Sequence, residues 1–216
     1  MISTDVMLLF DLDGTLWDSA KNVAISWNEV LRKEAPKELE VDEEFVHSVM
    51  GMTMKEIADH TITKMDEENK RKVFKHCEEY EVEYLEDKGG ELFEGVEETL
   101  KKLSQLGYKM AVVSNCQTGY INAFMTSMNM KQYFVDYEEW GRTLKSKAEN
   151  IRLVMNRNGF DKGIYIGDTQ KDMDAARGAK IPFIHASYGF GQVNNPDAII
   201  TKFSEMLNIV ETFQLK

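Results

Sequence analysis

The first residues whose types and spacing suggest chemistry are two acids in a short turn. Residues 11–16 read Asp-Leu-Asp-Gly-Thr-Leu, so one residue separates Asp11 from Asp13, and Gly14 follows. A glycine lets the chain turn here, so that both carboxylates can surround one cation. The same pattern occurs in polar turns after strands and in calcium loops, although the EF-hand spacing is absent. Alone, this stretch leaves metal binding and a polar turn open.

A second acidic stretch lies far along the chain. Residues 166–172 read Ile-Gly-Asp-Thr-Gln-Lys-Asp, which places Asp168 and Asp172 four positions apart. Two carboxylates after a short apolar run and a glycine again suggest a metal site. The alternative for Asp168 is a helix cap, because acidic residues are favoured at the start of helices.

Two further stretches carry groups that suit phosphate. Ser114 and Asn115 follow an apolar run and offer a hydroxyl and an amide as donors to phosphate oxygens. Lys147 directly precedes a predicted helix, whose first backbone donors favour anions. Lys145 is a neighbour of the same type, so the choice of Lys147 rests on its place beside the helix. Singly, Ser-Asn is also a common turn, and a lysine before a helix is usually solvated.

The elements that must position these residues alternate between strand and helix. Apolar runs typical of strands covered on both faces lie at 6–10, 109–113, 163–166, 181–184 and, more weakly, 197–200. Helical patterns lie at 96–106, 119–128, 147–157 and 170–177. The alternation predicts an α/β fold with a doubly wound parallel sheet. In such a sheet the loops at the carboxyl ends of strands converge on one crevice, where the four stretches can meet.

One long segment breaks the alternation. Residues 17–89 carry helical patterns rich in Lys and Glu and lack an obvious buried strand. We therefore predict a helical domain at 17–89, inserted into a core domain made of 1–16 and 90–216. Gly89 and Gly90 provide a hinge back into the sheet.

Composition limits the partners. The chain has 216 residues and a formal net charge of -11, which argues against nucleic acid because binding to phosphate backbones needs a basic face. The two cysteines show no metal-ligand spacing and fit a reducing compartment. The apolar run at 6–10 is too short for a signal segment or a membrane span. We expect a cytoplasmic monomer or homodimer that binds neither nucleic acid nor membrane.

Together, the four stretches resemble the haloacid dehalogenase-like hydrolase superfamily along nearly the whole chain. That family carries Asp-x-Asp-x-Thr after its first strand, Ser or Thr after its second, a later lysine, and Gly-Asp-x-x-x-Asp after its fourth. The matching residues occur here in the same order: Asp11, Asp13, Thr15, Ser114, Lys147, Asp168 and Asp172. The helical insertion is placed like the family's cap of the first type, as in the phosphoglycolate phosphatase-like branch.

The resemblance implies roles for the acids. Asp11 would be the nucleophile that forms an aspartyl-phosphate, and Asp13 would protonate the leaving oxygen and later activate water. Asp11, the backbone carbonyl of Asp13, and Asp168 would hold Mg²⁺. The dehalogenase branch has no acid two residues after its nucleophile, so Asp13 favours phosphate chemistry.

The resemblance also implies how the phosphoryl group is bound. Ser114, Asn115 and Lys147 would contact its oxygens. Asp172 would orient either Lys147 or metal-bound water.

A cap over the site implies small phosphorylated metabolites as substrates, because a protein could not fit beneath it. We therefore expect a magnesium-dependent phosphatase that acts on such metabolites. A phosphosugar mutase and a phosphonatase on the same fold are the alternatives, the latter needing a cap lysine. From another class, a catalytically silent regulatory module also stays open.

Position and composition suggest roles for further residues of the insertion. Trp17 and Asp18 lie at the mouth of the site by position, and the bend at 47–53 resembles the family's substrate-facing cap loop. Three alternating methionines are interpreted as packing, and the acidic run at 78–83 as a solvated helix face. The methionines are Met50, Met52 and Met54.

Overall fold

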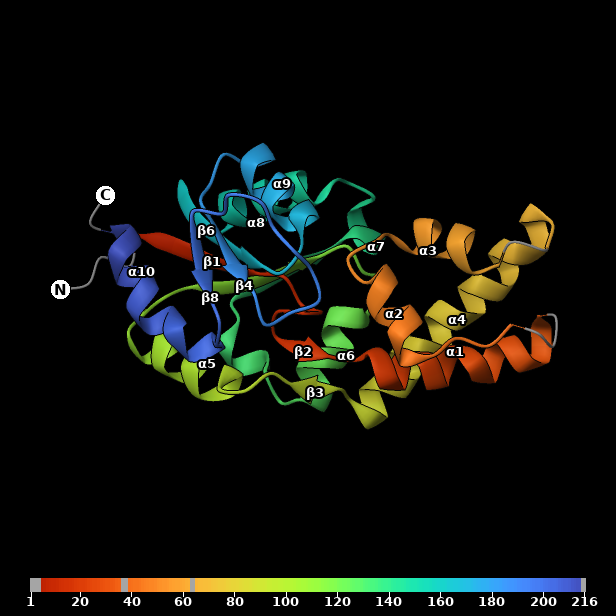
Figure 1. The fold of residues 1–216 in the computed structure, drawn as a ribbon. Coiled ribbons are helices and arrows are strands. Elements are labelled where there is room, and N and C mark those ends of the chain that lie inside the picture. Colours follow the sequence, from red (N-terminus) through yellow and green to blue (C-terminus); the bar gives the residue numbers. More distant parts are fainter. Residues whose placement is uncertain (1–4, 36–38, 63–64, 215–216) are drawn as a thin grey trace.

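The computed structural model describes residues 5–35, 39–62 and 65–214, and a six-stranded sheet forms its centre (Figure 1). All neighbouring strands are parallel, in the order β5-β4-β1-β6-β7-β8. The central strand β1 therefore separates β4 and β5 on one side from β6, β7 and β8 on the other. This confirms the predicted doubly wound sheet and makes β1 the point where the winding reverses. The strands are β1 (Val6–Phe10), β4 (Met110–Ser114), β5 (Asp136–Glu139), β6 (Lys162–Gly167), β7 (Phe183–Ala186) and β8 (Ala198–Ile200).

Helices cover both faces of the sheet, as the apolar strands require. Met7 and Leu9 of β1 pack with α8 (Lys147–Arg157) and α9 (Gln170–Gly178) on one face. Leu8 and Phe10 point the other way, toward α5 (Val96–Gln105) and α10 (Met206–Gln214). These four side chains are fully buried. The remaining elements of the core are α6 (Tyr120–Ser127), α7 (Trp140–Thr143) and two 3-10 turns, Lys131–Tyr133 and Phe203–Glu205.

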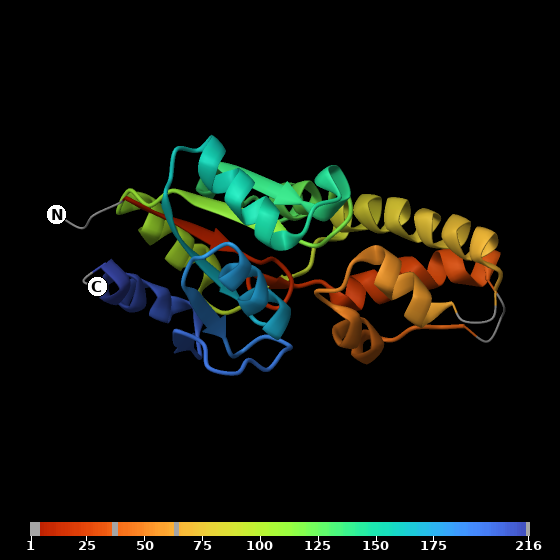
Figure 2. The same ribbon diagram turned by 90° about the horizontal axis from the view of Figure 1, so that it is seen from above.

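Four further helices lie to one side of the sheet, beyond the end of β1 (Figure 2). They are α1 (Ala20–Glu34), α2 (Glu43–Val49), α3 (Met54–Thr61) and α4 (Glu67–Lys88). Trp27 of α1 packs edge-on against Phe74 of α4, with ring centroids 5.4 Å apart. Two short strands, β2 (Trp17–Asp18) and β3 (Glu91–Leu92), pair antiparallel where the chain enters and leaves these helices. No helix among the described residues is long and apolar enough to cross a membrane.

Strand β5 has no counterpart in the sequence prediction. Its residues are polar, Asp-Tyr-Glu-Glu, and it forms one edge of the sheet. Arg157 at the end of α8 holds it in place. The guanidinium lies 2.5 Å from the Asp136 carboxylate and 2.6 Å from that of Glu138, and it donates to the carbonyl of Tyr137. Glu138 is only 1% exposed, and Arg157 is the nearer of its two cationic partners, since Arg142 lies 3.4 Å from the other carboxylate oxygen.

We expect Arg157→Met to lower the free energy of unfolding by about 2 kcal/mol, because it removes the nearer cation from the buried Glu138 carboxylate and the cation paired with Asp136. Arg32→Met is the control, since the Arg32–Glu40 pair is more than half exposed on both sides, and such pairs contribute less than ~1 kcal/mol. Urea unfolding of both variants measures the difference. Equal losses would show that Arg157 does not hold β5.

Candidate active site

Three acids from separate parts of the chain meet at the end of β1. Asp11 directly follows β1, Asp168 directly follows β6, and Asp172 lies in the first turn of α9. Their carboxylate oxygens lie within 4.8 Å of one another, and none of the three residues is more than 2% exposed. The pairing of β1 with β6 brings the first two together, because the amide of Asp11 donates to the carbonyl of Ile166 at 2.8 Å.

A single lysine lies among these acids. Lys147 is the first residue of α8, and its Nζ is 3.0 Å from Asp11 Oδ1 and 2.6 Å from Asp172 Oδ1. Ser146 caps the helix and fixes where it begins, through a reciprocal hydrogen-bond pair with Glu149. Lys145 is exposed. Of the two candidate lysines, therefore, Lys147 is the one that reaches Asp11.

Burial sets the electrostatics of the cluster. It raises the pKa of Asp11 well above its usual range, and Asp172 adds to the effect while Lys147 opposes it. Burial and Asp172 likewise raise the pKa of Asp168 to about 7. Burial works against the charge of Lys147, but Asp11 and Asp172 together raise the pKa of its ammonium. The contact with Lys147 lowers the pKa of Asp172, although burial opposes this shift.

The charges and contacts of this cluster fit a divalent cation. Three carboxylates face one ammonium, so that when all three are ionised two negative charges are buried without compensation. Asp168 Oδ1 is buried and has no hydrogen-bond partner among the described residues, whereas its Oδ2 accepts from the amide of Phe190 at 2.8 Å. Oxygen ligands of this kind are the ones that Mg²⁺ prefers. The helix-cap alternative for Asp168 is wrong, because Thr169 is the cap of α9.

Asp13 occupies the turn beyond the cluster and is fixed by three donors. Its Oδ1 accepts from Trp17 Nε1 at 2.9 Å, Ser19 Oγ at 2.9 Å and Tyr120 Oη at 2.8 Å. Burial raises the pKa of Asp13 to about 6, although these hydrogen bonds oppose the shift. Trp17 was expected at the mouth of the site and is instead fully buried, packed against Tyr120 and Phe124. From this buried position, its indole N–H holds the Asp13 carboxylate in place.

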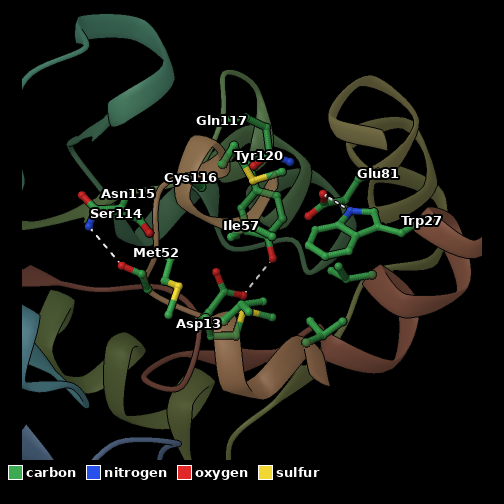
Figure 3. Close-up of a pocket in the computed structure, with 16 residues that line it drawn as sticks. Asp13, Trp27, Met52, Ile57, Glu81, Ser114, Asn115, Cys116, Gln117 and Tyr120 are labelled. Carbon is green, nitrogen blue, oxygen red and sulfur yellow. Dashed lines mark hydrogen bonds between the residues drawn. The ribbon is translucent and has the colours of Figure 1, made fainter. Parts of the chain in front are cut away.

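A cavity opens from Asp13 toward the helices α1–α4 (Figure 3). Ser114 and Asn115 line it on the core side, at the end of β4. Asn115 Nδ2 donates to the carbonyl of Gly51 at 3.2 Å, so this side chain joins the core to the turn between α2 and α3. The phosphate contacts expected of Ser114 and Asn115 stay predictions.

The turn between α2 and α3 forms the opposite wall of the cavity. The predicted bend at 47–53 is shorter in the structure, because α2 continues to Val49 and only the following residues turn. The three alternating methionines of this region do more than pack. Met50, Met52 and Met54 all line the cavity, together with Ile57 of α3.

Glu81 corrects the interpretation of the acidic run as a solvated helix face. It is 3% exposed, lines the cavity, and accepts a hydrogen bond from Trp27 Nε1 at 2.6 Å. Burial raises its pKa to about 8, although the hydrogen bond from Trp27 and the nearby Gln117 side chain oppose the shift. The sequence does hold a signal, since position 81 continues the spacing of three and four residues that places the buried Phe74, Cys77 and Leu85 on one face of α4.

Comparisons with known proteins agree with this geometry. The model of the family described as haloacid dehalogenase-like hydrolase matches residues 8–186. The match includes both acidic stretches and confirms the resemblance seen in the sequence.

Individual relatives align along nearly the whole chain. A phosphoglycolate phosphatase of Photorhabdus laumondii is 28% identical, with 97% of this chain and 94% of the relative covered. A phosphoglycolate phosphatase of Aquifex aeolicus is 27% identical, with 95% and 96% covered.

Solved structures share the fold. A predicted phosphoglycolate phosphatase from Haemophilus somnus superposes with a TM-score of 0.82 at 24% identity, covering 97% of this chain and 100% of that one. A subfamily IA hydrolase from Geobacter sulfurreducens gives 0.71 at 16% identity, covering 96% and 98%.

Gly14→Ala tests whether the Asp168 carboxylate needs the space that a side chain at position 14 would fill. Gly14 has a φ of 75°, and a Cβ there would lie 2.2 Å from Asp168 Oδ2. Gly159→Ala is the matched control, because Gly159 has a φ of 76° and nothing lies within 4 Å of its Cβ position. Both variants carry the penalty of ~1 kcal/mol or more for a left-handed alanine.

Beyond this shared penalty, we expect Mg²⁺ to raise the unfolding midpoint of Gly159→Ala but not that of Gly14→Ala, since an ion that binds stabilises the folded state. Urea unfolding with and without Mg²⁺ measures both effects. A Mg²⁺-dependent rise retained in Gly14→Ala would argue against this account of the turn.

Proposed function

The chain belongs to the haloacid dehalogenase-like hydrolase family, and we propose that it is a magnesium-dependent phosphatase of small phosphorylated metabolites. The observation that carries this proposal is the buried group of Asp11, Asp168, Asp172 and Lys147, with a fourth carboxylate, Asp13, in the adjoining turn. The activity for which the two relatives above are named, that of a phosphoglycolate phosphatase, belongs to the same reaction class.

In this proposal Asp11, the backbone carbonyl of Asp13, and Asp168 hold Mg²⁺. The ion supplies positive charge that reduces the repulsion between an anionic nucleophile and an anionic substrate. The surplus negative charge of the cluster and the unpaired Asp168 Oδ1 support this set of ligands.

Asp11 performs the first step. One of its oxygens attacks phosphorus, and the bond from phosphorus to the leaving oxygen breaks. The product on the protein is an aspartyl-phosphate, which divides a difficult hydrolysis into two easier steps. Lys147, 3.0 Å from Asp11, is close enough to neutralise the transferring group, and Asp172 at 2.6 Å holds the lysine in position.

Asp13 moves protons in both steps. It gives its proton to the leaving alkoxide, then accepts a proton from the water that attacks the aspartyl-phosphate. A pKa of about 6 suits a group that must be both acid and base near neutral pH. The donors on Oδ1 fix the orientation of this carboxyl group.

The helices α1–α4 act as a cap in this proposal. The hydrogen bond from Asn115 to Gly51 and the 3.5 Å contact between Lys171 and Glu56 join them to the core over the site. A covered cavity favours small substrates. A phosphonatase needs a lysine in this cavity, and no lysine occurs among the described residues that line it.

The proposal is tested by release of phosphate from p-nitrophenyl phosphate. We expect activity with Mg²⁺, loss of activity with a chelator, and a fall of at least ~10³ in kcat for Asp11→Asn, which removes the nucleophile. Asp161→Asn, on the exposed surface, is the control for a change of one charge.

Undiminished turnover by Asp11→Asn would contradict the proposed role of Asp11. Absence of turnover toward a broad panel of phosphoesters would instead favour a silent module. Product analysis with a hexose 1-phosphate separates release of phosphate from the transfer that a mutase performs.

Lys147 and Lys145 form a second matched pair. We expect Lys147→Met to lower kcat/KM for p-nitrophenyl phosphate by ~10² or more, because the removed charge faces the nucleophile. Lys145→Met should stay within about twofold, since exposed charges outside the site contribute little. Circular dichroism checks that both variants fold. Similar losses in the two variants would contradict the assignment of Lys147.

A further inference from the structure

The cavity beside Asp13 is where the leaving group of a substrate would lie. It extends from Ser114 and Asn115 to the cap, and Asp13 stands between the two ends (Figure 3). If Asp13 protonates the leaving oxygen, the rest of the leaving group must continue toward the cap. The side chains at that end therefore select the alcohol.

These side chains are mostly apolar. Met50, Met52 and Ile57 contribute from α3 and the turn before it, and Val23 and Trp27 contribute from α1. An apolar wall favours contact with the carbon atoms of a substrate. It provides no polar partners for a charged group that has lost its water.

The charged residue types that line the cavity are all acidic. Among the described residues in its wall there is no Lys, Arg or His, whereas Asp13 and Glu81 are both present. The lysine of the site, Lys147, lies outside this wall, between Asp11 and Asp172. A carboxylate or second phosphate on the leaving group would lose its water on entering and would find no cation to pair with.

Glu81 is a polar group in the cavity wall that can bind a hydroxyl group of a substrate. Its Oε2 is occupied by Trp27 Nε1 at 2.6 Å, and the buried Gln117 is its other neighbour. Burial raises its pKa to about 8, so at neutral pH the group carries a proton and can both donate and accept.

We infer that the preferred substrates are phosphomonoesters of uncharged, partly apolar alcohols, and that a second anionic group on the alcohol is rejected. This inference rests on the proposed phosphatase function and narrows its substrate class. The inferred substrate preference differs from the substrate in the names of the relatives, because the alcohol of 2-phosphoglycolate carries a carboxylate.

Two small phosphoesters of nearly equal size test the inference. 2-Phosphoglycolate and 2-hydroxyethyl phosphate share two carbons and a phosphate and differ in carrying a carboxylate or a hydroxymethyl group. With the intact protein and Mg²⁺ we expect kcat/KM to be at least ~10-fold higher for 2-hydroxyethyl phosphate. An equal value, or a preference for 2-phosphoglycolate, overturns the inference.

Binding to Asp11→Asn, measured by calorimetry with Mg²⁺, repeats the comparison without turnover. We expect a lower Kd for 2-hydroxyethyl phosphate, and the opposite order overturns the inference. Turnover of p-nitrophenyl phosphate by the wild-type protein judges the proposed function separately. Failure of the function and failure of the inference thus give different results.

A cation placed in the wall should weaken the preference. Met52 is half-buried at the cavity, so Met52→Lys can be accommodated with its ammonium toward the open side, and Met52→Gln is a neutral control of similar length. We expect Met52→Lys to raise the ratio of kcat/KM for 2-phosphoglycolate over 2-hydroxyethyl phosphate by ~10-fold relative to Met52→Gln. An unchanged ratio counts against the inference.

Discussion

The burial of three carboxylates around one ammonium is the constraint on which the rest of this structure depends. Asp11, Asp168 and Asp172 converge because β1 and β6 are adjacent and parallel, so that the loops leaving their carboxyl ends share one edge. Lys147 reaches them because α8 begins close to the same edge, where Ser146 caps it. Such a cluster repels itself unless cations hold it together. The apolar sheet and its helices supply the rigidity that keeps these charges together.

Much of this arrangement follows from the sequence, for physical reasons that are local. The apolar runs that became β1, β4, β6 and β7 are buried on both faces, so their composition alone identifies them. The acids at the ends of β1 and β6 were recognised through their order along the chain. Lys147 was preferred because it stands next to a helix start, and that helix indeed begins with it.

The failures of prediction have non-local causes. Strand β5 is polar and is held by Arg157, which lies about twenty residues later, so no window around β5 contains the interaction. Glu81 sits in a run of acids, and its burial is decided by Trp27, 54 residues away. Trp17 was placed by its distance from the catalytic turn, whereas its indole packs against α6. In each case the partner is distant in sequence, and only the fold brings it near.

The antiparallel pair of β2 and β3 has a consequence for how the molecule is organised. Trp17 faces Leu92, and Asp18 faces Glu91, so the segment containing α1–α4 leaves and rejoins the core at one point. Gly90 permits this close crossing, since a Cβ there would lie 2.7 Å from the carbonyl of Asp18. A segment closed in this way can change length and sequence in evolution without altering the register of the sheet. In the proposed function, residues at the edge of the sheet carry out the phosphoryl chemistry and the inserted helices select the alcohol, so the selection can diverge while the chemistry is kept.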